Sequence, residues 1–197
     1  MSTALPILLI PFLLLSAPAV ATASESDGVA VEHTLEELAE IQQLREELRS
    51  LSARNHWGGM VRKWTRLKEL RVSHSLPELI TGAHIERHVG DVAAAYDLLR
   101  EAARNGGERE VIDWLWEIDS GYGRVVLEAP EGSERELEVA VMPLVPDQRA
   151  CIEFAQQAVT TAGRFEGMLP AGSYVFGGHS FQVTPGPRSV SIKVEPY

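Results

Sequence analysis

The chain has 197 residues, a net charge of −10 and a single cysteine. This charge excludes nucleic acid as a partner for the whole molecule, and the lone Cys151 excludes an intramolecular disulfide. The length allows one large domain or two small ones. The sequence pattern changes from helical to strand-like between Asp119 and Gly123, which favours two. We therefore expect an α+β protein with an all-α domain at 34–119 and a β domain at 120–197.

The first 23 residues carry no charged side chain and have the features of an export signal. An apolar core from Leu5 to Leu15 precedes Ala21-Thr22-Ala23, the small-x-small pattern that signal peptidase accepts. Cleavage after Ala23 would leave a short acidic, flexible N-terminus at 24–33 and place the protein in the periplasm or outside the cell. The alternative is an uncleaved anchor, although the apolar core is shorter than the roughly 20 residues of a spanning helix.

Two helices are predicted next. The first begins at Thr34, which has Glu37 at the spacing of a capping box, and its apolar residues follow at helical spacing: Leu38, Ile41, Leu44, Leu48 and Leu51. The second runs from about Trp57 to Val72 and carries five cations against Glu69. We expect the two helices to pair, with the cations facing the acidic first helix. The alternatives are a dimeric coiled coil for the first helix and contact of the second with an anionic membrane surface.

The stretch 79–103 is the best-defined pattern in the helical region. It reads as two short helices folded back at Gly90-Asp91, with small residues that allow close packing: Gly82, Ala83, Ala95 and Ala102. In this spacing the stretch resembles one tetratricopeptide repeat, with Glu86 where that family often has an aromatic residue. The resemblance implies a helical hairpin with a groove that binds a protein partner. A fifth helix at 108–119 is expected to cap the pair.

Short β runs dominate the rest of the chain. Runs at 124–129 and 136–142, joined by a turn at 130–133, predict a hairpin with one solvated face. A helix at 147–162 follows, and then four further strands: 164–168, 173–176, 180–184 and 189–194. The segment FEGMLPAGSYVF resembles the transthyretin-like, carboxypeptidase-regulatory modules and the related PEGA modules. That resemblance implies a small antiparallel β-sandwich, into which the helix would be inserted.

Few residues suggest a catalytic or metal-binding role. His84 and His88 are four apart on one predicted helix, the ligand spacing of zinc proteases, but nothing marks a third ligand, so we expect no metal and no cofactor. Cys151 could be a thiol nucleophile, and Glu136 with Glu138 could imitate a glycosidase pair. A buried small side chain and a solvated strand face explain them more simply. Nucleophile and phosphate-loop motifs are absent from the sequence.

The hypothesis that follows is a non-enzymatic scaffold or adaptor of the bacterial cell envelope. Its predicted contacts are Arg62, Arg66 and Arg87, on the groove side of the helical hairpin and on the second helix. Arginines recognise carboxylates in a bidentate manner, so the expected protein partner is acidic or carboxylate-bearing.

Two alternatives belong to other classes of function. The β domain could bind cell wall or glycan through an exposed edge around Tyr174, Phe176 and His179, since aromatic side chains stack on sugars. The pair His84 and His88 could serve a metal-dependent hydrolase.

Overall fold

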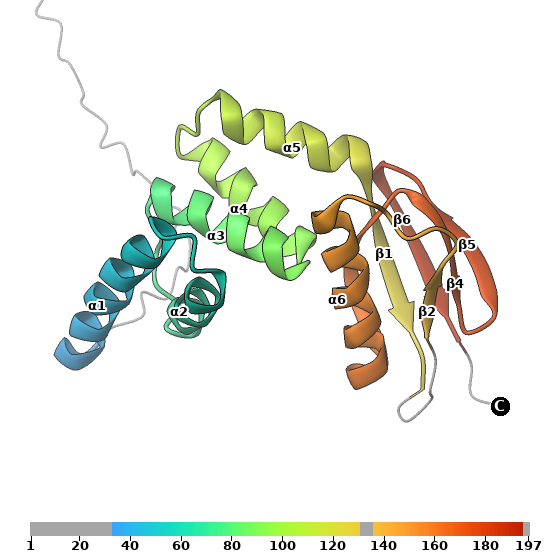
Figure 1. Ribbon diagram of the computed structural model, residues 1–197, viewed down its shortest axis with the longest axis horizontal. Helices are drawn as coiled ribbons and strands as arrows, with labels where there is room; N and C mark the ends of the chain where they lie inside the picture. Colours follow the sequence, from blue (N-terminus) through green and yellow to red (C-terminus); the bar gives the residue numbers. More distant parts are fainter. Residues whose placement is uncertain (1–32, 131–135, 195–197) are drawn as a thin grey trace, which may run out of the picture. The chain divides into compact units, whose positions relative to one another are not determined.

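The computed structural model describes residues 33–130 and 136–194, which belong to one compact unit (Figure 1). Within these ranges helices come first and strands follow, with one helix between the strands. The predicted α+β class is therefore confirmed. The predicted signal sequence, nearly all of the N-terminus at 24–33 and most of the predicted turn at 130–133 lie outside the described residues. No helix in the described ranges combines the length and apolar character needed to cross a bilayer.

Five helices make up the first part of the fold: α1 (Leu35–Ser52), α2 (Trp57–Glu69), α3 (Leu76–Val89), α4 (Val92–Arg104) and α5 (Arg109–Gly121). The predicted capping box opens α1, where the amide of Glu37 donates to Thr34 Oγ1 at 3.2 Å and the amide of Thr34 donates to the Glu37 carboxylate at 2.8 Å. Helix α1 packs on α2, α3 on α4, and α4 on α5. These pairings agree with the order expected from the sequence.

The strands and α6 form the second part: β1 (Tyr122–Glu128), β2 (Leu137–Val139), α6 (Pro146–Ala162), β3 (Arg164–Pro170), β4 (Gly172–Phe176), β5 (His179–Val183) and β6 (Gly186–Lys193). They build two three-stranded sheets, ordered β3-β1-β6 and β2-β4-β5. In the first sheet Val125 of β1 pairs with Gly167 of antiparallel β3 and with Val190 of parallel β6. Helix α6 packs on β3 and reaches β2 and α3.

The predicted hairpin of the first two strands is wrong. Strands β1 and β2 lie in different sheets, and Leu137 of β2 pairs with Phe176 of β4. The first sheet is also mixed rather than antiparallel, because β6 runs parallel to β1. Alternation of apolar and polar residues predicts a strand and its buried face, but it does not identify the strand beside it. The prediction was therefore right about the strands and wrong about this pairing.

One hydrophobic core joins the two parts. It includes buried residues of α3, α4 and α5 together with residues of both sheets and α6, among them Leu99, Ile118, Leu127, Ile152 and Phe176. A smaller cluster fills the space between α1, α2 and α3: Ile41, Leu44, Leu48, Met60, Trp64, Leu67 and Ile85. The turn between α3 and α4 meets α6 closely, because a Cβ on Gly90 would lie 2.2 Å from the carbonyl oxygen of Ala150. Gly90 also has a φ of +96°, which favours glycine.

Candidate partner-binding surface

Exposed apolar side chains gather in two segments. Six of the eight large apolar side chains that are exposed in the described ranges lie on α5 or in the connection between β2 and α6: Ile112, Trp116, Val141, Met142, Leu144 and Val145. We call these six residues the apolar surface. Trp116 is 72% exposed and Leu144 is 90% exposed. Each segment thus leaves large apolar side chains in water, and contiguous exposed apolar patches are characteristic of interaction sites.

Helix α5 has apolar residues on two faces, and only one of them is covered. Val111 and Ile118 are buried in the core. Ile112 and Trp116 are four residues apart and therefore lie on one face of the helix. That face points away from the core, since both side chains are more than half exposed. The helix needs only the first stripe to pack against its neighbours, so the second stripe is not explained by folding.

The connection between β2 and α6 is unusually apolar for an exposed segment. Residues 139–146 read VAVMPLVP, without one charged or polar side chain. After Val139, only the amide of Ala140 continues the strand ladder, donating to the carbonyl of Ser173 at 3.0 Å. Strand β2 thus ends at residue 139 and not at the predicted 142, and Pro143 and Pro146 cannot donate to a ladder further along. The apolar side chains beyond that point are left in water.

Arg87 links α3 to α5 and to the start of α6. From α3, its Nη2 atom donates to Glu117 at 2.9 Å and to Asp147 at 3.2 Å, and its side chain is only 14% exposed. Glu117 directly follows Trp116 of α5, and Asp147 lies in the first turn of α6, next to Pro146. The guanidinium also lies 6.0 Å from the centre of the Trp114 ring. One largely buried cation therefore links α5 and the first turn of α6 to α3.

The charges around Arg87 have a clear effect on its pKa. Burial is the largest influence and lowers the pKa, but the carboxylates of Glu117 and Asp147 outweigh it, so the net effect is upward. The side chain is therefore charged at every physiological pH. Both carboxylates are about half exposed, so solvent weakens each single ion pair.

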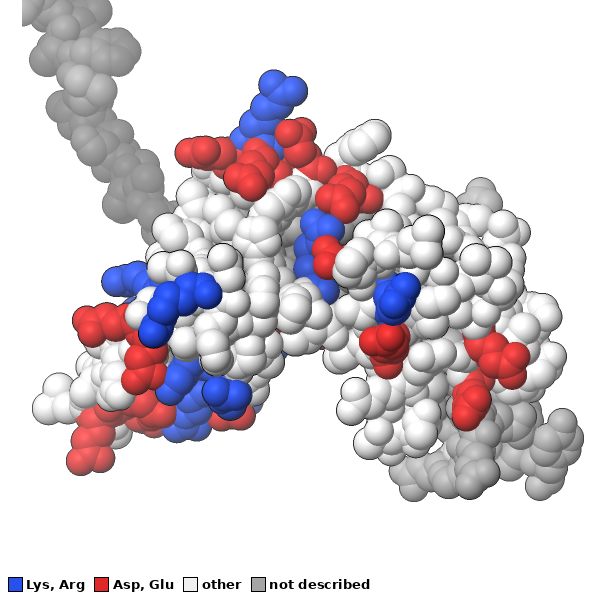
Figure 2. Space-filling model, viewed as in Figure 1, with Lys and Arg blue, Asp and Glu red and all other residues white. Residues whose placement is uncertain are grey.

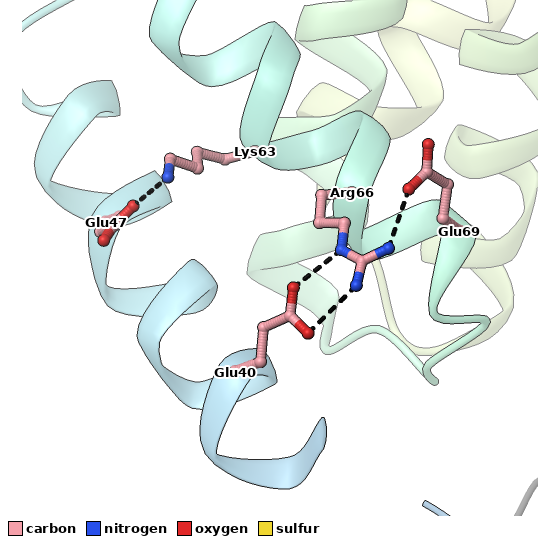
Figure 3. Close-up of polar contacts among 5 residues, drawn as sticks. All are labelled: Glu40, Glu47, Lys63, Arg66 and Glu69. Atoms are coloured by element: carbon pink, nitrogen blue, oxygen red, sulfur yellow. Dashed lines mark hydrogen bonds and ion pairs between the residues drawn. The ribbon is translucent and has the colours of Figure 1, made fainter. Parts of the chain in front are cut away.

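The other two predicted arginines lie on α2 and contact different groups. Arg66 forms a two-point ion pair with Glu40 of α1, at 2.7 and 3.1 Å, and a third contact with Glu69 at 3.1 Å (Figure 3). Lys63 pairs with Glu47 beside it, so two cations of α2 face α1 as expected, whereas Lys68 pairs with Glu86 of α3. Arg62 is exposed and forms no ion pair with the described residues. The structure shows no contact that joins Arg87 to the α2 arginines.

The two histidines are each engaged with a tryptophan. His84 meets the edge of Trp114 on α5, and His88 stacks on Trp57 of α2, both with ring centres 4.2 Å apart. Burial, together with the charge of Arg87, lowers the pKa of His84. No group of three or more potential metal ligands occurs within residues 33–130 and 136–194. The i, i+4 spacing of the pair serves two separate helix contacts here.

The remaining candidate groups belong to the core or to solvated strand faces. Cys151 is fully buried, its thiol donates to the carbonyl of Met168 at 3.1 Å, and burial raises its pKa to about 12. A thiol in that state is a poor nucleophile. Glu136 and Glu138 are exposed at β2, and between them Leu137 is buried.

The edge proposed for glycan binding is mostly internal. Tyr174 and Phe176 are buried, and the hydroxyl of Tyr174 donates to the carbonyl of Pro170 at 2.8 Å. Only His179 of this trio is exposed. A sugar could therefore not stack on the two aromatic rings without opening the core.

Acidic side chains are numerous on the helix that carries Ile112 and Trp116. Helix α5 and its N-cap carry five acids against Arg109: Glu108, Glu110, Asp113, Glu117 and Asp119. Figure 2 shows acidic side chains gathered along this helix. Arg109 itself lies 3.7 Å from Asp113. The part of the apolar surface on α5 is thus flanked by acidic side chains.

None of the residues of the apolar surface was among the predicted contacts. Two signals were present in the sequence: a run of eight apolar residues between Glu138 and Asp147, and the pair Ile112 and Trp116 lying off the buried stripe of its helix. The run was interpreted as the end of a strand followed by proline breaks, which hid its exposure.

No family model, curated protein or solved structure matches this chain. Its function therefore has to be inferred from the surface and the charges described above.

Proposed function

We propose that this protein is a scaffold or adaptor of the bacterial cell envelope, which binds a protein partner through the apolar surface and catalyses no reaction. The observation that carries this proposal is the exposure of Trp116 and Leu144, at 72% and 90%, on segments that Arg87 holds to one helix. Tryptophan is the residue most enriched in the energetic centres of protein interfaces. Interfaces also exclude charge from their centres and place it at the rim, and on α5 acidic side chains lie beside Ile112 and Trp116.

The predicted arginines take different places in this proposal. Arg66 and Arg87 already have carboxylate partners within the fold, so an acidic partner would have to displace them. Arg62 has no such competitor among the described residues and is proposed as a secondary contact. The apolar surface becomes the principal site.

Three further parts of the proposal concern the export of the protein and its fold. Export rests on the apolar leader and the Ala21-Thr22-Ala23 pattern. We propose a tetratricopeptide-like hairpin for α3 and α4, supported by the full burial of Ala83, Ala95 and Ala102. A small transthyretin-like sandwich is proposed for the two sheets, supported by a core that contains Val125 of one sheet and Tyr174 of the other.

Site-specific photo-cross-linking in the native cells tests the binding function. A photoreactive amino acid would replace Trp116 in one variant and Leu144 in a second. Leu35, which is 86% exposed on α1, is the matched control position. We expect the same discrete heterologous protein to be cross-linked from positions 116 and 144 and not from 35. Equal labelling from all three positions, or no adduct from 116 and 144, would contradict the proposal.

A further inference from the structure

The outer strands of the two sheets differ in how they are covered. They are β3 and β6 in one sheet, and β2 and β5 in the other. Helix α6 lies along the side of β3 and β2 (Figure 1), where Nε2 of Gln156 donates to the carbonyl of Leu137 at 2.7 Å. No strand within residues 33–130 and 136–194 pairs with β6 on the side away from β1. Strand β6 therefore has a free edge.

This free edge presents backbone groups in a regular row. With eight residues, β6 is the longest strand of the described ranges. The amide of Val194 donates to the carbonyl of Glu128 of β1 at 2.9 Å. Because the amides of consecutive strand residues point to opposite edges, the amide of Ile192 also faces β1, while those of Ser191 and Lys193 face away from it. Such a row of free donors and acceptors is a template for a further strand.

The core-facing side of this edge is apolar and incompletely covered. Val190 and Ile192 of β6 pack on the main core, as does Phe181 of β5, and all three remain partly exposed. Phe181 pairs with the buried Tyr174, and their rings stack with centres 5.6 Å apart. Side chains of a strand alternate between its two faces. An added strand with apolar residues at every second position would therefore cover what Val190 and Ile192 leave exposed.

The opposite face of the same sheet carries two cations without a carboxylate partner. Arg124 of β1 and Lys193 of β6 lie on this face by their register, and both are exposed. Neither forms an ion pair with a described residue. The acids of this face on β1 and β3, Glu128 and Glu166, both contact Arg164. The face next to the free edge is therefore suited to acidic side chains.

The register also fixes the spacing of these acids. An added strand would lie about 4.8 Å from β6, and its residue opposite Lys193 would meet that cation directly. The residue opposite Ser189, four positions away, would meet Arg124, which is paired with Ser189. The Arg124 guanidinium lies 5.9 Å from the centre of the Tyr96 ring and would turn across the small serine. Two acids about 13 Å apart along the added strand fit this face.

We infer that the free edge of β6 binds an extended segment of a partner protein as an additional strand. Apolar side chains at alternate positions of this segment cover Val190 and Ile192, and acids on its other face meet Lys193 and Arg124. Addition of a strand to a sheet edge is a recurring mode of peptide recognition. A second copy fits the edge less well, because pairing two β6 strands would bring the cations of both copies onto one continuous face. The inference goes beyond the proposed function, since none of the six residues of the apolar surface takes part.

Fluorescence anisotropy with the purified full-length chain tests the class of ligand. The probe is a labelled peptide of about nine residues, the length of a long strand. It has valine at every second position and threonine at the others, except for two glutamates four positions apart. Its counterpart carries lysine in place of both glutamates. We expect the glutamate peptide to bind, its affinity to fall as salt is raised, and the lysine peptide to bind about tenfold more weakly or not at all.

Two N-methylated forms of the glutamate peptide test the backbone pairing. One is methylated at the valine amides and the other at the remaining amides, so each form lacks the donors of one edge of the peptide. Because only one edge of the peptide can face β6, one form should lose binding and the other should bind like the parent peptide. Equal affinities of the two forms would contradict the addition of a strand.

Variants of the protein locate the site. Ser191→Pro removes a donor of the free edge and none that faces β1, a position at which proline is tolerated. It should weaken the glutamate peptide by about tenfold or more, whereas Ser191→Ala should not. Lys193→Glu should weaken it severalfold. Arg62→Glu, at an exposed position of α2, makes the same change in net charge and should have no effect. Circular dichroism verifies folding, and the N-methylated peptides decide if Ser191→Pro does not fold.

The other outcomes overturn the inference in recognisable ways. Tighter binding of the lysine peptide would show that the charge of the ligand is wrong. A dimer of the chain in light scattering that Ser191→Pro converts to a monomer would show that a second copy occupies the edge. If the glutamate peptide fails to bind, the inference is wrong, while cross-linking from positions 116 and 144 still decides the proposed function.

Discussion

Trp64 is the side chain on which α2 and α3 meet. Its Nε1 atom donates to the carboxylate of Glu86 at 2.7 Å, and Lys68 donates to the same carboxylate oxygen. Glu86 is 3% exposed, and a buried carboxylate is tolerated only when it is paired and hydrogen-bonded. The carboxylate of Glu86 therefore links the Trp64 ring of α2 to α3.

The contact of Trp64 with Gly82 leads to a prediction of opposite sign for two glycines. A Cβ on Gly82 would lie 2.3 Å from the Trp64 ring, whereas a Cβ on Gly58 would meet only the end of Arg62, at 3.9 Å. Gly82→Ala should therefore lower the free energy of unfolding by about 1–3 kcal/mol through overpacking. Gly58→Ala should raise it by about 0.5–1 kcal/mol, because alanine favours the helix. Urea unfolding followed by tryptophan fluorescence measures both, and a stabilised Gly82→Ala would disprove the close contact.

At the scale of elements, what is encoded locally could be predicted and what depends on distant residues could not. Caps, helical stripes and glycine stops lie within a few residues of one another, and every predicted helix and strand has its counterpart in the structure. The partner of β1 is chosen by residues some 40 positions later in β3 and some 60 later in β6. The alternation of residues in β1 contains no information about its partner strands, so β2, the next strand in the sequence, was wrongly predicted as its partner.

Arg87 is where α3, α5 and α6 are held together, which makes a second prediction possible. Arg87→Ala removes the ion pairs with Glu117 and Asp147 and exposes part of Trp114. Because the arginine is largely buried and the carboxylates are half exposed, we expect a loss of about 1–3 kcal/mol in the free energy of unfolding. Arg62→Ala, at an exposed arginine without an ion pair in the described ranges, should stay within about 0.5 kcal/mol of the wild type. If chemical denaturation showed equal changes in the free energy of unfolding for the two substitutions, Arg87 would not be holding the three helices together.

At the scale of the whole molecule, the predicted and the observed candidate sites differ for a physical reason. The prediction followed excess charge, and the five cations at 57–73 stood out in the sequence. In the fold, three of those five are matched by carboxylates of α1, α2 and α3. The apolar surface could not be recognised in the same way, because an exposed Leu144 and a buried Leu137 look alike in a strand-like run. Which of these two leucines is exposed to solvent depends on the positions of the neighbouring helices and strands.

Global stability should depend on pH through His74, which lies between α2 and α3 and whose ring is tilted against that of Trp64, with ring centres 4.7 Å apart. Burial is the main cause that lowers its pKa; Arg45 adds to this effect, while Glu78 and Glu101 oppose it. Its buried Nδ1 atom has no hydrogen-bond partner in the described ranges. The folded state therefore favours the neutral ring, while the unfolded chain takes up a proton near pH 6.5.

The sign of the dependence follows from proton binding. Below about pH 6.5 the unfolded state holds more protons than the folded state, so the free energy of unfolding is highest above that pH and falls as the pH drops toward the folded-state pKa. The net charge of −10 shrinks over the same range, which acts in the opposite direction by relieving repulsion. His74→Phe keeps a ring against Trp64 and removes the titration, so its stability should fall less than that of the wild type between about pH 7.5 and about pH 5.5. His179→Phe, at an exposed position of β5, is the matched control and should follow the wild type. Parallel profiles for His74→Phe and the wild type would show that His74 does not couple folding to pH.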